Sequence, residues 1–139
     1  MVEDGFFDTV IQNGTIVDGS GESRFQSDIG IKNNRIQAMG DLSMSKSGRQ
    51  INAANRIVAP GFIDVHTHDD RVLLAKPTMD MKISQGVTSV IVGNCGISLA
   101  PLVADNPPPP LDLIAEAGAC RYSTFDQFLQ EVEYAPPAV

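Results

Sequence analysis

Hydrophobic and polar positions alternate with a short period along the first 58 residues, and turn-forming dipeptides interrupt the pattern at Asn13-Gly14 and Asn33-Asn34. Short runs rich in apolar and β-branched residues flank the two dipeptides: Phe7 to Gln12, Thr15 to Val17, Asp28 to Lys32 and Arg35 to Met39. Such dipeptides favour two-residue hairpin turns, whose central residues need positive φ. The pattern therefore predicts a small antiparallel β domain over residues 1–58, with a hairpin at each dipeptide.

From residue 59 onward the pattern becomes that of a parallel α/β fold. Phe62 to His66 is typical of a short, mostly apolar strand, and the helical spacing of Met79 and Ile83 predicts a helix that Gly86 ends. Val87 to Val92 is an unbroken apolar and β-branched run, which predicts a strand buried on both faces. Strand, helix and strand within about 30 residues form a βαβ unit.

The chain's two histidines lie at the end of the first of these strands. His66 and His68 are two residues apart, so in an extended strand they point to the same face, with Cα atoms about 6.6 Å apart. Two neutral imidazoles on a rigid strand end can converge on one divalent metal ion. We therefore interpret the pair as metal ligands rather than as two solvated side chains.

Cys95 follows the second strand, within Gly93-Asn94-Cys95-Gly96. Ligands of parallel α/β folds gather at the C-terminal ends of strands, and neighbouring strands lie about 4.8 Å apart. A thiolate beside two imidazoles would make a plausible zinc site, although the spacing alone is equally compatible with a buried structural thiol. Cys120 is expected to be structural, and Asp69 and Asp70 are expected to be solvated.

Composition and charge narrow the class of protein. The 139 residues carry a net charge of −7, which disfavours nucleic acid and anionic membrane surfaces as partners. No apolar run approaches the length of about 20 residues needed for a membrane span, and the start of the chain does not resemble a signal peptide. Two cysteines do not indicate a disulfide framework, so a reducing cytoplasm is the expected compartment.

The stretch Ala59-Pro60-Gly61-Phe62-Ile63-Asp64-Val65-His66-Thr67-His68 resembles the first metal motif of the amidohydrolase superfamily. Its continuation through Asp70, with the segment from Ser84 to Gly96, resembles the N-acyl-D-amino-acid deacylase (D-aminoacylase) branch. The resemblance implies a β-sandwich portion in residues 1–58. It also implies the first βα units of an incomplete TIM-type barrel in residues 59–139, because a full barrel takes about 250 residues.

In most superfamily members a carboxylated lysine or a glutamate bridges two metal ions, and in this branch a cysteine matching Cys95 takes that place. The resemblance thus implies zinc held by His66, His68 and Cys95. It implies a hydrolase that cleaves the amide of N-acyl-D-amino acids to a carboxylate and a D-amino acid. The family's further histidines and its catalytic aspartate have no match here, so we expect the isolated chain to be inactive and its open strand edges to favour self-association.

Two other functions remain open at this point. A cyclic amidohydrolase of the hydantoinase or dihydroorotase kind shares the His-x-His motif but favours a bridging lysine. Cys95 and its flanking glycines argue against this function. A non-catalytic interaction module would have kept the fold and lost the chemistry. Such a module should not bind zinc, and replacing Cys95 should weaken zinc binding only in a deacylase-type site.

Overall fold

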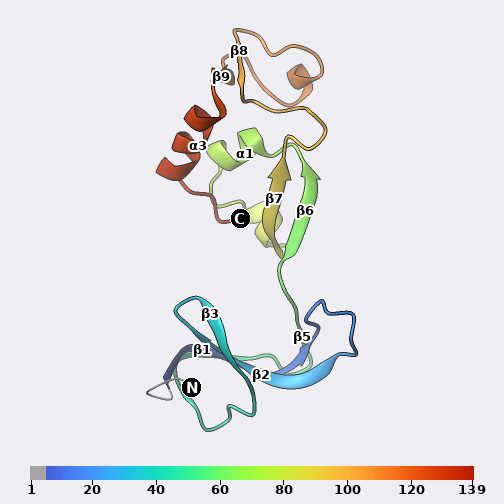
Figure 1. Cartoon of the computed structure of the whole chain (residues 1–139), viewed down its shortest axis with the longest axis vertical. Coiled ribbons are helices and arrows are strands. Elements are labelled where there is room, and N and C mark those ends of the chain that lie inside the picture. Colours follow the sequence, from blue (N-terminus) through green and yellow to red (C-terminus); the bar gives the residue numbers. More distant parts are fainter. Residues whose placement is uncertain (1–5) are drawn as a thin grey trace. The chain divides into compact units, whose positions relative to one another are not determined.

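The computed structural model describes residues 6–139 (Figure 1). The chain divides into two compact units, the first reaching to Pro60 and the second running from Gly61 to Val139. None of the helices in the described residues is long and apolar enough to cross a membrane.

The first unit is a single mixed sheet of five strands: β1 (Phe6–Ile16), β2 (Phe25–Lys32), β3 (Arg35–Gly40), β4 (Lys46–Asn52) and β5 (Ile57–Val58). The strand order is β3-β2-β1-β4, and β5 also pairs with β1. The β1–β2 and β2–β3 pairs are antiparallel, but β4 and β5 both run parallel to β1. The predicted antiparallel domain is therefore wrong for β4 and β5, because the chain crosses to the far edge of β1 after β3.

The two turn-forming dipeptides behave differently. Asn33 and Asn34 have φ of 52° and 58° and join β2 to β3, which confirms the second hairpin. The first hairpin is wrong, since β1 runs through Asn13 without turning and its register with β2 shifts between Ile11 and Gly14. Asn13 keeps its positive φ of 62° inside this bulge, where its N–H donates to the Asp28 carboxylate at 2.8 Å.

The second unit contains the expected βαβ arrangement. The strands β6 (Phe62–Thr67) and β7 (Val87–Val92) pair in parallel, and α1 (Asp70–Ala75) and α2 (Asp80–Ile83) lie between them in the chain. The remaining elements are β8 (Leu102–Ala104), a 3₁₀ helix (Leu111–Leu113), β9 (Cys120–Tyr122) and α3 (Phe125–Tyr134). A TIM-type barrel is not evident in the described residues, where the parallel sheet has two strands.

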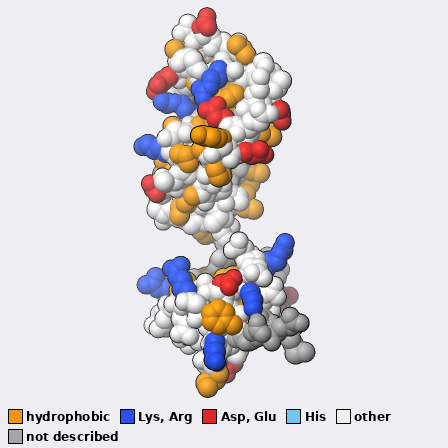
Figure 2. Space-filling model, turned by 90° about the vertical axis from the view of Figure 1, so that its left-hand side faces the viewer, with side chains coloured by type: hydrophobic (Ala, Val, Ile, Leu, Met, Phe, Trp, Pro, Cys, Tyr) orange, Lys and Arg blue, Asp and Glu red, His pale blue; other side chains and the backbone are white. Residues whose placement is uncertain are grey.

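The apolar core of the second unit lies beside the parallel sheet rather than around it. It is built from Leu73, Met79, Leu99, Cys120, Tyr122, Phe128 and their neighbours, so Cys120 is a buried thiol, as expected. In contrast, Phe62 is 64% exposed and Ile91 is 48% exposed. The prediction that β7 is buried on both faces is therefore wrong within the described residues. Figure 2 shows apolar side chains among charged ones on the surface of this unit.

Candidate metal centre

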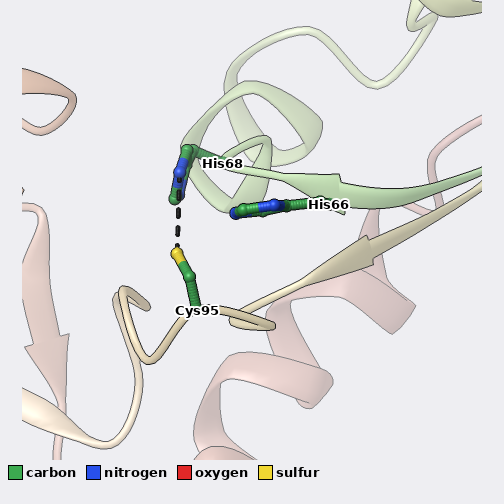
Figure 3. A group of neighbouring side chains, drawn as sticks. All are labelled: His66, His68 and Cys95. Atoms are coloured by element: carbon green, nitrogen blue, oxygen red, sulfur yellow. Dashed lines mark hydrogen bonds between the residues drawn. The ribbon is translucent and has the colours of Figure 1, made fainter.

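The structure brings the three predicted ligands together. His66 lies in β6, His68 follows the last residue of that strand, and Cys95 lies in the loop after β7 (Figure 3). The potential ligand atoms of the three residues all lie within 4.8 Å of one another. The Cys95 Sγ is 3.7 Å from the His68 Nε2, and the two imidazole centroids are 5.7 Å apart.

The parallel pairing of β6 and β7 explains this convergence, because it brings the C-terminal ends of both strands to the same edge. Between the two histidines, Thr67 is only 6% exposed, as expected from the alternation of side chains along a strand. After β7, the loop bends through Gly93 and Gly96, whose φ values of 72° and 80° suit glycine. This bend lets Cys95 approach His68.

A lysine from α2 holds the carboxylates that lie beside the histidines in the sequence. The Lys82 Nζ is 2.7 Å from the Asp64 carboxylate, 2.9 Å from that of Asp69 and 3.3 Å from the Thr67 hydroxyl. The hydrogen bond to Asp64, followed by that to Asp69, raises the pKa of Lys82. The same hydrogen bond from Lys82 is the main cause that lowers the pKa of Asp64. One ammonium group is thus shared between the two carboxylates.

The expectation that Asp69 and Asp70 are solvated is wrong. Asp69 pairs with Lys82 and its side chain is 15% exposed, while Asp70 is only 2% exposed. Asp70 begins α1 and accepts the Leu99 N–H at 3.1 Å, so it ties the start of that helix to the segment that follows Cys95. Sequence reasoning missed this role because the partner is a backbone group 29 residues away.

Asn94 is the other contributor that sequence reasoning missed. Its side-chain amide donates to the Val65 carbonyl oxygen at 2.7 Å and so crosses from the loop after β7 to β6. The position of Asn94 next to Cys95, in a loop flanked by glycines, could have indicated a role at the site. The sequence alone does not predict that the Val65 carbonyl oxygen is its hydrogen-bond acceptor.

The donor set fits a zinc ion. Zinc bonds of about 2.0–2.1 Å to nitrogen and 2.3 Å to sulfur place tetrahedral ligand atoms about 3.3–3.6 Å apart, close to the 3.7 Å between Cys95 Sγ and His68 Nε2. The His68 Nδ1 is buried and has no hydrogen-bond partner within residues 6–139. A histidine that binds zinc through Nε2 usually donates its other ring N–H to a supporting acceptor, so the fit rests on the two imidazoles and the thiol rather than on this nitrogen.

Comparison with known proteins decides the family. The amidohydrolase family model matches residues 49–118, half of the chain. The chain belongs to the amidohydrolase family. Its similarities place it in the D-aminoacylase branch of that family, as the resemblance of the motifs predicted.

The D-aminoacylase of Alcaligenes xylosoxydans xylosoxydans is 48% identical over 133 residues, which are 96% of this chain and 28% of that protein. A solved D-aminoacylase structure, described for the role of its binuclear metal centre, matches with a TM-score of 0.91 and 51% identity. That match covers 96% of this amidohydrolase chain and 28% of the solved chain.

The N-acyl-D-glutamate deacylase of Bordetella bronchiseptica, solved with zinc and a phosphonate inhibitor, matches with a TM-score of 0.86 and 38% identity. The match covers 94% of this chain and 27% of that one. This amidohydrolase chain therefore spans little more than a quarter of the length of the relatives it matches.

Proposed function

We propose that this amidohydrolase is a zinc-dependent deacylase that hydrolyses the amide of N-acyl-D-amino acids to a carboxylate and a free D-amino acid. The observation that carries the proposal is the convergence of His66, His68 and Cys95, whose potential ligand atoms all lie within 4.8 Å of one another. Support comes from similarity to proteins named as D-aminoacylase and N-acyl-D-glutamate deacylase.

We propose that His66, His68 and Cys95 hold the zinc. Zinc bound there would supply Lewis-acid activation of the substrate carbonyl and of water. The site lies at the C-terminal edge of β6 and β7, the edge at which parallel α/β folds bind substrates. Lys82 engages both Asp64 and Asp69 in ion pairs.

The catalytic base and the remaining ligands are proposed to lie outside these 139 residues. Among the described residues near the cluster, the carboxylates of Asp64 and Asp69 are paired with Lys82, and Asp70 is buried against Leu99. The chain also covers only 28% of the D-aminoacylase relative. We therefore propose that the first unit (1–58) serves as scaffold, that residues 59–139 open a barrel, and that the isolated chain has no deacylase activity.

A zinc titration tests the site directly. The chain should bind zinc in competition with a chromophoric chelator, and Cys95→Ser should weaken binding by more than the roughly 10- to 100-fold typical of losing a supporting hydrogen bond. Cys120→Ala is the matched control, because that thiol is buried in the core away from the cluster. Equal affinities of Cys95→Ser and the unmodified chain would refute the sulfur ligand and favour a hydantoinase-type site.

Activity and association are tested separately. A longer protein containing this sequence should release D-amino acids from N-acetyl-D-amino acids and lose this activity with Cys95→Ser. Turnover by the 139-residue chain alone would refute the proposal that the base lies elsewhere. Failure to bind zinc at all would favour the non-catalytic module.

Self-association through the exposed strands β6 and β7 should appear as oligomers in light scattering, and a monodisperse monomer would contradict it.

A further inference from the structure

The backbone ladder between β6 and β7 is interrupted beside the ligand cluster. Phe62, Ile63 and Asp64 pair with residues of β7, and pairing resumes only between Thr67 and Val92. Register shifts fall between Phe62 and Ile63 and between Asp64 and Thr67. Val65 and His66 therefore have no matched residue on β7, and only the Thr67–Val92 pair continues the ladder beside the loop that carries Cys95.

A side chain bridges this interruption. The side-chain amide nitrogen of Asn94, Nδ2, donates to the Val65 carbonyl oxygen at 2.7 Å. Val65 directly precedes His66 and Asn94 directly precedes Cys95, so one side-chain-to-backbone hydrogen bond links the two ligand-bearing segments. Its N···O distance is at the short end of the normal range for an amide–carbonyl hydrogen bond.

The loop is closed by a hydrogen bond from the Gly96 N–H to the Gly93 carbonyl oxygen at 3.0 Å, which holds the loop to itself but not to β6. Gly93 and Gly96 flank Asn94 and Cys95, and both have positive φ. Positive φ at the two glycines suits this turn, and a contact outside the turn is still needed to hold it against β6. In the described residues, the Asn94 side chain makes a hydrogen bond that connects this loop to β6.

We propose that Asn94 is a positioning residue that sets the distance of the Cys95 sulfur from the two imidazoles. This inference rests on the proposed zinc site, and Asn94 acts through the backbone of its neighbour rather than by touching the metal. Asn94 is exposed and uncharged. Its removal therefore takes away no core contact and no local charge, which separates positioning from folding and from electrostatic effects.

The experiment compares Asn94→Ala with the unmodified chain and with Asn106→Ala. Asn106 is an exposed asparagine of the same unit, and its side chain makes no hydrogen bond within residues 6–139. Zinc affinity is measured by chelator competition, and the cobalt-substituted protein is examined for thiolate-to-cobalt charge-transfer absorption. We expect Asn94→Ala to weaken zinc binding about 10- to 100-fold and to reduce that absorption, with metal-free stability unchanged. Asn106→Ala should leave all three measurements unchanged.

The outcomes separate the two proposals. If the unmodified chain binds zinc and Asn94→Ala matches it in affinity and cobalt spectrum, the positioning role is refuted and the zinc site stands. If Asn94→Ala lowers the metal-free unfolding midpoint enough to account for the weaker binding, its role is structural and the inference is also refuted. If the unmodified chain binds neither zinc nor cobalt, the proposed function fails first.

Discussion

Replacing Gly61 by alanine should force apart the two strands that carry the candidate ligands. A Cβ at Gly61 would lie 2.1 Å from the Thr88 Oγ1, 2.3 Å from its Cγ2 and 2.7 Å from its Cβ. Rotation about χ1 of Thr88 moves the first two atoms but leaves its Cβ in place. Since carbon atoms pack at about 3.5–4.0 Å, β6 and β7 would have to separate by about 1 Å at this end.

The expected cost follows from two opposing effects. Overpacking of this kind costs about 1–3 kcal/mol. The φ of Gly61 lies outside the left-handed region, so alanine can adopt it without backbone strain. Alanine also restricts the unfolded chain more than glycine does, which offsets about 0.4–1 kcal/mol of the overpacking cost. We therefore expect a net loss of about 1–2 kcal/mol in the free energy of unfolding. With a urea m-value of about 1–3 kcal/mol/M, the midpoint should fall by about 0.3–2 M.

Tyrosine fluorescence reports on the affected unit alone. The chain has no tryptophan, and both of its tyrosines, Tyr122 and Tyr134, lie in the second unit. Urea unfolding followed by this signal compares Gly61→Ala with the unmodified chain, and then repeats the comparison in a Thr88→Gly background. The clash disappears when Thr88 has no side chain, so Gly61→Ala should cost little in that background.

Two results would refute this reasoning. An unchanged midpoint in Gly61→Ala would mean that the strands accommodate the methyl group without cost. An equal loss in the Thr88→Gly background would mean that the cost does not arise from contact with Thr88.

Three further perturbations have defined outcomes. The pKa of Asp64 is lowered by Lys82, so their pair stabilises the fold above the unfolded-state pKa of the aspartate and is lost as the pH falls through the lowered value. Lys82→Met should therefore reduce the loss of stability as the pH falls below about 4, measured as urea midpoints. Burial and a hydrogen bond to a glutamate raise the pKa of Tyr122 to about 12. In a spectrophotometric titration, the Tyr122→Phe variant should lack the tyrosine ionisation that the unmodified chain shows near pH 12. In the first unit, a Cβ at Gly30 would lie 2.5 Å from Cε1 of the buried Phe7, so Gly30→Ala should cost about 1–3 kcal/mol in urea unfolding followed by circular dichroism.

The pairing of His66 with His68 followed from a rule that needs only the local sequence, whereas the spacing of Cys95 was equally compatible with a structural thiol and only the family resemblance implied it as a ligand. Side chains two apart on a strand share a face, and parallel strands end at the same edge of a sheet. The Asn33-Asn34 hairpin was predictable for the same reason, because the positive φ of both asparagines is a local property.

The remaining features depended on partners distant in sequence. Asn13-Gly14 suits a bulge as well as a turn, and β1 continues past it because β4 and β5 pair with β1 along its length. The burial of Asp70 depends on Leu99, and the hydrogen bond of Asn94 depends on an interruption in a ladder 29 residues back. Hydrophobic periodicity contains no information about these partners.

The composition and exposure of β7 have a practical consequence. Its six residues, Val-Thr-Ser-Val-Ile-Val, carry no charge and no proline, and Ile91 is 48% exposed. Uncharged hexapeptides of high β-propensity can stack into dry cross-β zippers when they are accessible. A preparation of this polypeptide is therefore expected to form thioflavin-positive fibrils on concentration. A charged residue in place of Ile91 should act as a gatekeeper that delays them.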